Sequence, residues 1–176
     1  MVLYFLRHAN AGERLTNPKK DAKRALDKEG IEQCGIVGRA LTAMDVQVDL
    51  ILTSPLKRAT QTASLVGNEL SFEGALKLEN GLLPSASFAD FRKMLEKYGR
   101  YESIMLVGHN PNLSQFLGRI ICEDGCEADT DLKKGAVARV ELGRHSATLN
   151  WCLTPKILRA LYSAAAESSR PKTSRK

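Results

Sequence analysis

Short apolar runs alternate with amphipathic stretches along most of the chain. Three of these runs are mainly aliphatic and lack the alternation of a half-exposed strand: Val2–Leu6, Val48–Thr53 and Ser103–Val107. Such runs are typical of parallel strands that are covered by helices on both faces. Apolar residues at helical spacing follow them and predict helices near 28–44, 56–70, 88–98 and 113–122.

Capping residues mark where two of the expected helices begin. Asp27 precedes an apolar stripe that runs from Ile31 to Met44, and Ser87 precedes a stripe that runs from Phe88 to Tyr98. The stretch 13–23 is rich in charges and broken by a proline, so it predicts no regular element.

The later part of the chain predicts β structure and a final helix. Residues 75–83 are weakly patterned and suit an edge strand at most. Val137–Leu142 and Ala147–Leu153 alternate around a short Gly-containing turn, which predicts a hairpin, and an amphipathic helix follows Pro155. Strands that alternate with helices, without an internal repeat, predict a single α/β domain.

Composition places the basic excess of the chain at its end. The 176 residues carry a formal net charge of +6, and Arg170, Lys172, Arg175 and Lys176 account for most of it. We therefore expect one domain over residues 1–167 and a basic, disordered tail over 168–176. The tail could make a weak contact with nucleic acid or an acidic partner, but the nearly balanced domain makes nucleic acid an unlikely main ligand.

Export and membrane insertion are not expected from the sequence. No apolar run approaches the length of a membrane span, and no basic segment precedes the first strand. The four cysteines, Cys34, Cys122, Cys126 and Cys152, lack the spacing of a metal site. Thiols without an export signal predict a reducing, cytoplasmic location.

Polar residues follow the three apolar strands at the points where they end. The first strand is followed by Arg7 and His8, the second by a segment that includes Arg58, and the third by Gly108 and His109. The carboxyl ends of neighbouring parallel strands meet at one edge of a sheet. Two arginines and two histidines would there form a cationic cup for a dianion, with an imidazole able to attack phosphorus.

These three segments resemble the signatures of the histidine phosphatase superfamily. They read Leu6-Arg7-His8-Ala9, Ser54-Pro55-Leu56-Lys57-Arg58-Ala59-Thr60-Gln61-Thr62 and Val107-Gly108-His109-Asn110-Pro111. The small size and the segment from Arg24 to Gly30 are most similar to the phosphohistidine phosphatases of the SixA type. The resemblance implies a phosphoglycerate mutase-like fold, a single-domain three-layer α/β/α sandwich with a mostly parallel central sheet.

The resemblance also implies a role for each site residue. His8 would be the nucleophile that becomes phosphorylated, and Arg7, Arg58 and a protonated His109 would hold the transferring phosphoryl group. Arg24 is expected to reach the same pocket, with Asn10 and Gly108 as further substrate-binding positions. No metal and no organic cofactor is implied. A nearby carbonyl should orient the His8 ring, and neighbouring arginines should lower the pKa of His8.

Two departures from the family pattern bear on this assignment. Ala9 replaces the usual glycine after the Arg-His pair, which would strain the backbone if that position needed a positive φ. Relatives that cleave esters also place an acid near residues 80–81, where this chain has Asn80 and Gly81, with Glu79 as the nearest carboxyl. An alkoxide leaves poorly without a proton donor, whereas the imidazole of a phosphohistidine can leave protonated at neutral pH.

The expected function is therefore hydrolysis of phosphohistidine on a protein, such as a phosphotransfer domain of a signalling relay. A phosphatase for a small phosphorylated metabolite is the first alternative. A mutase fits less well, because it needs the missing acid and a closed pocket. A degenerate phosphoprotein-binding module is the non-enzymatic alternative. A compact domain without lid insertions is expected to leave the pocket shallow and open.

Overall fold

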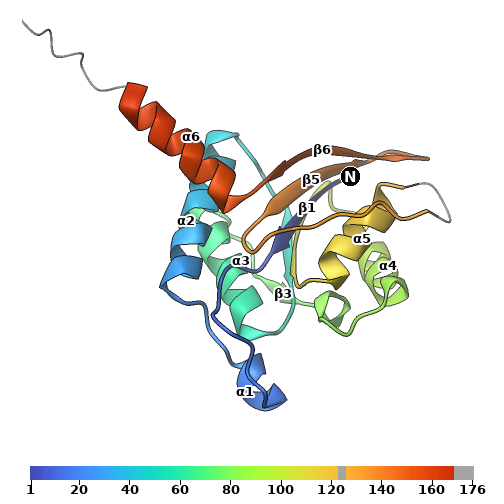
Figure 1. Ribbon diagram of the computed structural model, residues 1–176. Helices are drawn as coiled ribbons and strands as arrows, with labels where there is room; N and C mark the ends of the chain where they lie inside the picture. Colours follow the sequence, from blue (N-terminus) through green and yellow to red (C-terminus); the bar gives the residue numbers. More distant parts are fainter. Residues whose placement is uncertain (123–125, 169–176) are drawn as a thin grey trace, which may run out of the picture.

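A computed structural model describes residues 1–122 and 126–168 of the chain (Figure 1). Its centre is a six-stranded sheet in the order β3-β2-β4-β1-β5-β6. The strands are β1 (Val2–Arg7), β2 (Leu50–Thr53), β3 (Lys77–Leu78), β4 (Ser103–Gly108), β5 (Val137–Leu142) and β6 (Ala147–Leu153). The helices are α1 (Pro18–Ala22), α2 (Lys28–Ala43), α3 (Lys57–Glu69), α4 (Phe88–Lys97), α5 (Asn112–Ile120) and α6 (Pro155–Ser168), with a short 3₁₀ turn η1 (Asn80–Leu82).

The sheet is parallel over four strands and antiparallel at one end. β4 pairs in parallel with β1 on one side and with β2 on the other, and β2 pairs in parallel with β3. β5 is antiparallel to β1 and forms the predicted hairpin with β6. The carboxyl ends of β1, β2 and β4 therefore open on one edge of the sheet, as expected from the sequence.

Helices cover both faces of the sheet, which confirms the predicted three-layer sandwich (Figure 1). On one face, α2, α3 and α6 enclose a core that includes Val37, Leu41 and Val66. On the other face, α4 and α5 enclose a second core that includes Phe91 and Phe116, whose rings stack 4.6 Å apart. The four central residues of β1 and of β4 are buried, because each of these strands lies between two neighbours under both layers.

Local capping explains where the helices begin. The Asp27 carboxylate accepts a hydrogen bond from the Gly30 N–H, and Ser87 forms a capping box with Asp90 at the start of α4. α1 was not expected from the sequence. It begins because Pro18 suits the first helical position and the Asn17 side chain accepts hydrogen bonds from the N–H groups of the next turn.

The predicted apolar stripe of α2 is buried at its centre and exposed at both ends. In α2, Cys34, Val37 and Leu41 are buried, but Ile31 and Met44 at the ends of the stripe are half exposed. In α6 only Leu158 of the expected apolar face is buried. The predicted tail, residues 168–176, lies outside the described residues apart from Ser168, the last residue of α6. None of the described helices is long and apolar enough to cross a membrane.

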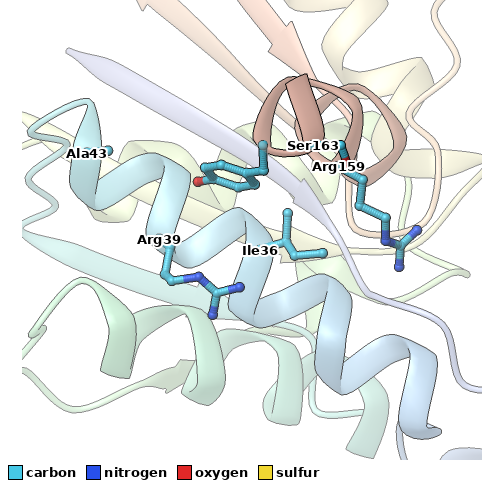
Figure 2. A pocket seen from close by; sticks show the side chains of 6 residues that line it. Ile36, Arg39, Ala43, Arg159 and Ser163 are labelled. Carbon is cyan, nitrogen blue, oxygen red and sulfur yellow. The ribbon is translucent and has the colours of Figure 1, made fainter. Parts of the chain in front are cut away.

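The exposed part of α6 leaves a groove against α2 (Figure 2). The groove has a volume of about 570 Å³ and is lined by Ile36, Arg39, Ala43, Arg159, Tyr162 and Ser163. Its lining includes none of the residues that the sequence predicts for the site. The candidate chemistry therefore lies elsewhere, at the carboxyl edge of the sheet.

Candidate active site

The predicted site residues meet where β1 and β4 end side by side. Arg7 is paired with Gly108 in the parallel ladder, and the His8 N–H donates to the Gly108 carbonyl over 3.0 Å. The His8 and His109 rings follow directly and lie 4.9 Å apart between centroids. Gly108 is thus part of the ladder that aligns the two histidines, and a Cβ there would approach Leu113 to 3.1 Å.

The His8 ring is held by its own chain. Its Nδ1 donates to the Ala9 carbonyl over 2.7 Å, so the proton belongs on Nδ1, and Nε2 has no hydrogen-bond partner among the described residues. The Ala9 N–H in turn donates to Thr62 Oγ1, which also bonds to the Arg58 carbonyl. This fixes the ring with Nε2 as the free lone pair, as a nucleophilic imidazole requires.

Burial keeps the His8 imidazole neutral. The residue is only 7% exposed. This burial is the largest of the effects that lower the pKa of His8 to about 3. The charges of Arg58, Arg7 and Arg24 lower this pKa further. The expected effect of the arginines is therefore present but secondary to desolvation.

His109 lies in a buried position beside the end of β2. Its Nε2 lies 2.9 Å from Ser54 Oγ at the end of β2, and the ring is almost completely buried. Burial first, then the charges of His8, Arg58, Arg24 and Arg7, lower the pKa of His109 to about 2. Burial therefore disfavours the charged ring in the unliganded site, and a protonated His109 beside a bound phosphoryl group stays a prediction.

Arg58 and Arg7 approach the histidines from two elements. Arg58 lies in the first turn of α3, as predicted, and is 5% exposed. α3 begins without a side-chain cap, which leaves its first N–H groups and its dipole available to an anion. Arg7 ends β1, and its Nη1 donates to the Leu132 carbonyl over 2.8 Å.

A buried carboxylate, Asp21, joins two of the arginines and was missed in the sequence. Asp21 Oδ1 accepts from Arg24 Nε over 2.8 Å, and Oδ2 lies 3.3 Å from Arg58 Nη1. Burial acts to raise the pKa of Asp21, but the Leu15 N–H and the two guanidinium groups outweigh it and lower the pKa to about 2. The available signal was the spacing of Asp21 and Arg24, which suits one turn of helix.

The other two predicted side chains, Arg24 and Asn10, lie in different surroundings. Arg24 donates to the carbonyls of Ala11 and Gly12, and its charge acts on both imidazoles, so it belongs to the same cluster. The Asn10 amide is engaged on both sides, donating to Glu29 over 2.7 Å and accepting from Lys134 over 2.6 Å. Asn10 therefore supports the loop after His8, and a direct contact with substrate stays a prediction.

Glu79 does not have the environment of a proton donor. Its Oε1 accepts hydrogen bonds from Lys97 over 2.7 Å and from Tyr98 over 2.5 Å. Partial burial acts to raise the pKa of Glu79, but these hydrogen bonds outweigh it and leave the pKa below its usual range. A carboxyl that is ionised and already bonded to α4 is poorly suited to protonate a leaving group.

Ala9, which stands in place of the usual glycine, causes no backbone strain. The non-glycine residues with a positive φ in the described part of the chain are Asp45 and Ser71, so Ala9 adopts an ordinary conformation. Its methyl group is fully buried. The condition for strain, a positive φ at this position, is therefore not met.

Unsatisfied polar atoms concentrate in this cluster. Within residues 1–122 and 126–168, the buried side-chain polar atoms without a hydrogen-bond partner are Arg7 Nε, Arg58 Nε and His109 Nδ1. Buried polar groups are rarely left unpaired away from functional sites. The same described ranges contain no group of three or more His, Cys, Asp or Glu side chains that could hold a metal ion.

Comparison with known proteins identifies the class of protein to which the chain belongs. Residues 3–82 match the model of the histidine phosphatase superfamily (branch 1), and these residues include β1 from its second residue on, β2 and the first two signature segments. An uncharacterized protein of Picosynechococcus sp. is 34% identical over 119 residues, which cover 66% of this chain and 70% of that protein. The chain belongs to the histidine phosphatase superfamily.

Within the superfamily, the similarity is to the SixA type. Phosphohistidine phosphatase SixA of Escherichia coli is 24% identical over 161 residues, which cover 88% of this chain and 94% of that protein. A solved structure of the protein histidine phosphatase SixA complexed with tungstate has a TM-score of 0.77, with 24% identity, and covers 90% of this chain and 99% of that chain.

The same fold also serves a phosphatase of a small molecule. The crystal structure of the α-ribazole phosphatase from Shigella flexneri has a TM-score of 0.67 and 21% identity, and covers 88% of this chain and 97% of that one. The fold therefore supports phosphatase chemistry without selecting between protein and small-molecule substrates.

Proposed function

We propose that this protein hydrolyses phosphohistidine on other proteins through a phosphorylated His8. The observation that carries the proposal is the His8 ring, which is anchored through Nδ1 to the Ala9 carbonyl and surrounded by the charges of three arginines, with no partner for Nε2 in the described part of the chain. A neutral imidazole has the lone pair needed to attack phosphorus. The surrounding cations stabilise the charge that spreads over the phosphoryl oxygens during transfer.

The proposed reaction has two steps, and solvent supplies the proton and the water that they need. His8 Nε2 forms a bond to phosphorus as the bond from phosphorus to the substrate imidazole breaks, and the leaving imidazole takes a proton from solvent. Water then attacks phosphorus in phospho-His8, which releases inorganic phosphate and regenerates the neutral ring. Arg7, Arg58 and His109 are proposed to hold the phosphoryl group in both steps, and Arg24 to add positive charge.

The environment of Glu79 supports a phosphohistidine substrate. Glu79 is held by Lys97 and Tyr98, and the charges that act on both imidazoles come from arginines. An alkyl ester needs a proton at its leaving oxygen, whereas an imidazole with a reference pKa of about 6.5 leaves readily at neutral pH. The proposed location is the cytoplasm, where the described cysteines, all free thiols, are stable.

A small phosphorylated metabolite is the alternative substrate, since an α-ribazole phosphatase has the same fold. The test measures phosphate release from three substrates: a phosphohistidine-bearing phosphotransfer domain, a phosphoserine peptide and an aryl phosphate. We expect turnover of phosphohistidine at least about a hundredfold faster than that of phosphoserine, since a missing general acid is worth roughly that much. His8→Ala should abolish it.

Three outcomes contradict parts of the proposal. Equal hydrolysis of the phosphoserine peptide means that an acid acts in the site and the phosphohistidine preference is wrong. Activity that survives His8→Ala excludes His8 as the nucleophile. Binding of the phosphoprotein without any hydrolysis would make the site a reader of phosphorylated proteins.

A further inference from the structure

The segment from Gly12 to Lys23 projects from the body beside the candidate active site. Figure 1 shows its helix, α1, at one end of the molecule and apart from both helix layers. Every residue from Gly12 to Lys20 is exposed, and Asp21 is the buried residue of α1. A segment that buries so little apolar surface gains little stability from its own packing.

The exposed surface of this segment is strongly basic. Its cationic side chains are Arg14, Lys19, Lys20 and Lys23, all exposed, against one exposed carboxylate, Glu13. Among the described residues, none of these four cations forms an ion pair. The positive field of the segment is therefore not neutralised from within the fold and is available to an acidic partner.

Buried contacts hold this segment against the catalytic cluster. Asp21 binds Arg58 Nη1 through both its carboxylate and its backbone carbonyl, at 3.3 and 3.1 Å. Arg24 links the two ends of the segment, because its guanidinium donates to the carbonyls of Ala11 and Gly12. Arg14 is close enough for its charge to lower the pKa of Arg58. The basic surface therefore has a fixed position relative to the phosphoryl site.

An apolar side chain lies among these cations. Leu15 is 43% exposed, and its N–H donates to Asp21 Oδ1 over 3.0 Å, so its position is also fixed to the cluster. A small phosphorylated metabolite bound at His8 gains little from an apolar side chain on an exposed segment. A macromolecular surface does, because interfaces combine apolar contacts with a charged rim.

We propose that residues 12–23 form a docking element for the phosphorylated protein substrate, and that this partner presents an acidic surface next to its phosphohistidine. The inference rests on the proposed function and extends it to the partner. Attraction between the two surfaces raises the rate of encounter and orients the phosphohistidine toward His8. Small substrates gain nothing from the element, because they do not reach beyond the pocket.

The experiment compares two double variants with equal changes of net charge. Lys19→Glu with Lys20→Glu reverses the charge of the docking element, while Arg92→Glu with Lys93→Glu does the same on exposed positions of α4. For each variant, kcat/KM is measured on an acidic phosphotransfer domain phosphorylated on histidine and on an aryl phosphate, at several ionic strengths. Thermal unfolding checks that both variants fold.

We expect the α1 variant to lose about tenfold or more in kcat/KM on the protein, and to lose its salt dependence, with the aryl phosphate unchanged. The α4 variant should match the wild type on both substrates. The milder Lys19→Ala with Lys20→Ala should give an intermediate loss on the protein substrate.

The outcomes separate the two proposals. A wild-type protein that does not hydrolyse the phosphohistidine domain overturns the proposed function itself. A wild-type protein that is active, with both charge variants equally active, overturns only the docking element. Parallel losses on protein and aryl phosphate would also overturn it, because the segment would then act on the chemistry. So would variants that lose binding to a DNA oligonucleotide but keep full activity on the protein.

Discussion

The carboxylate of Asp21 binds the guanidinium of Arg58 from a different element, with Oδ2 3.3 Å from Nη1. The same carboxylate binds Arg24 Nε over 2.8 Å, so one buried anion lies between two cations. Without it, Arg58, Arg24 and Arg7 would repel one another around two buried imidazoles. The cationic site is thus held together by a negative charge that the sequence did not single out.

Asp21→Asn should weaken both the site and the fold. The amide keeps one acceptor but loses the charge, so Arg24 and Arg58 are held less firmly, and we expect kcat/KM for phosphohistidine to fall about tenfold. Removing one partner of a buried ion pair costs on the order of 3 kcal/mol of unfolding free energy. Steady-state kinetics and denaturant unfolding measure the two effects.

The pH dependence separates the charge of Asp21 from simple packing. A folded pKa of about 2, below the ordinary 3.8, gives stability that is present above pH 4 and lost as the pH falls through about 2. Asp21→Asn should lack this part of the acid transition, and should differ from the exposed control Asp45→Asn. Identical acid transitions in the two variants would contradict the ion-pair role.

The two buried histidines predict that the stability of the fold also changes in a second, higher range of pH. The pKa of His8 is lowered to about 3 and that of His109 to about 2, whereas both bind protons near pH 6.5 in the unfolded chain. Lowering the pH below 6.5 therefore favours the unfolded state, and stability falls steadily toward pH 3. Imidazole NMR of the unliganded protein should show both rings neutral from pH 8 to pH 5. A His8 signal that titrates near 6.5 would overturn this.

Glu79→Gln tests whether the site lacks a carboxyl acid. Glu79 bonds to Lys97 and Tyr98, so its loss should lower the unfolding free energy by roughly 1 kcal/mol and leave phosphohistidine turnover within about twofold of wild type. Thermal unfolding and phosphate release measure the two quantities. A hundredfold loss of activity on any phosphate ester would show that Glu79 acts as the acid after all.

Ala9→Gly tests the departure from the usual Arg-His-Gly pattern. Ala9 has no positive φ and a fully buried methyl group, so glycine relieves no strain and adds backbone freedom to the unfolded chain. We expect a loss of about 1 kcal/mol in unfolding free energy and no gain in kcat. A substantial increase in kcat would mean that alanine restricts a motion that the reaction needs.

The strands and the convergence of their ends could be predicted because buried parallel strands are short apolar runs whose following residues share one sheet edge. The burial of Asp21 could not be predicted, because its spacing to Arg24 suits a solvated ion pair among lysines just as well as a buried one. The burial of His109 could not be predicted either, since it arises only when the ends of β2 and β4 lie side by side and bring Ser54 against the ring. Ile31 and Met44 have helical spacing but are half exposed, because periodicity alone does not show how far along a helix its neighbours pack.

The pairing of β1 has a consequence for how the chain acquires activity. β1 lies in the centre of the sheet, yet its hydrogen-bonded neighbours come late in the chain, with Val2 opposite Ser103 and Leu6 opposite Val137. Contacts across such sequence separations form slowly, because a long loop must close first. A chain synthesised only to residue 100 would contain His8, Arg24 and Arg58 but no strand to hold β1. Turnover would therefore begin only after the last long-range pairing, which makes activity a sensitive measure of completed folding.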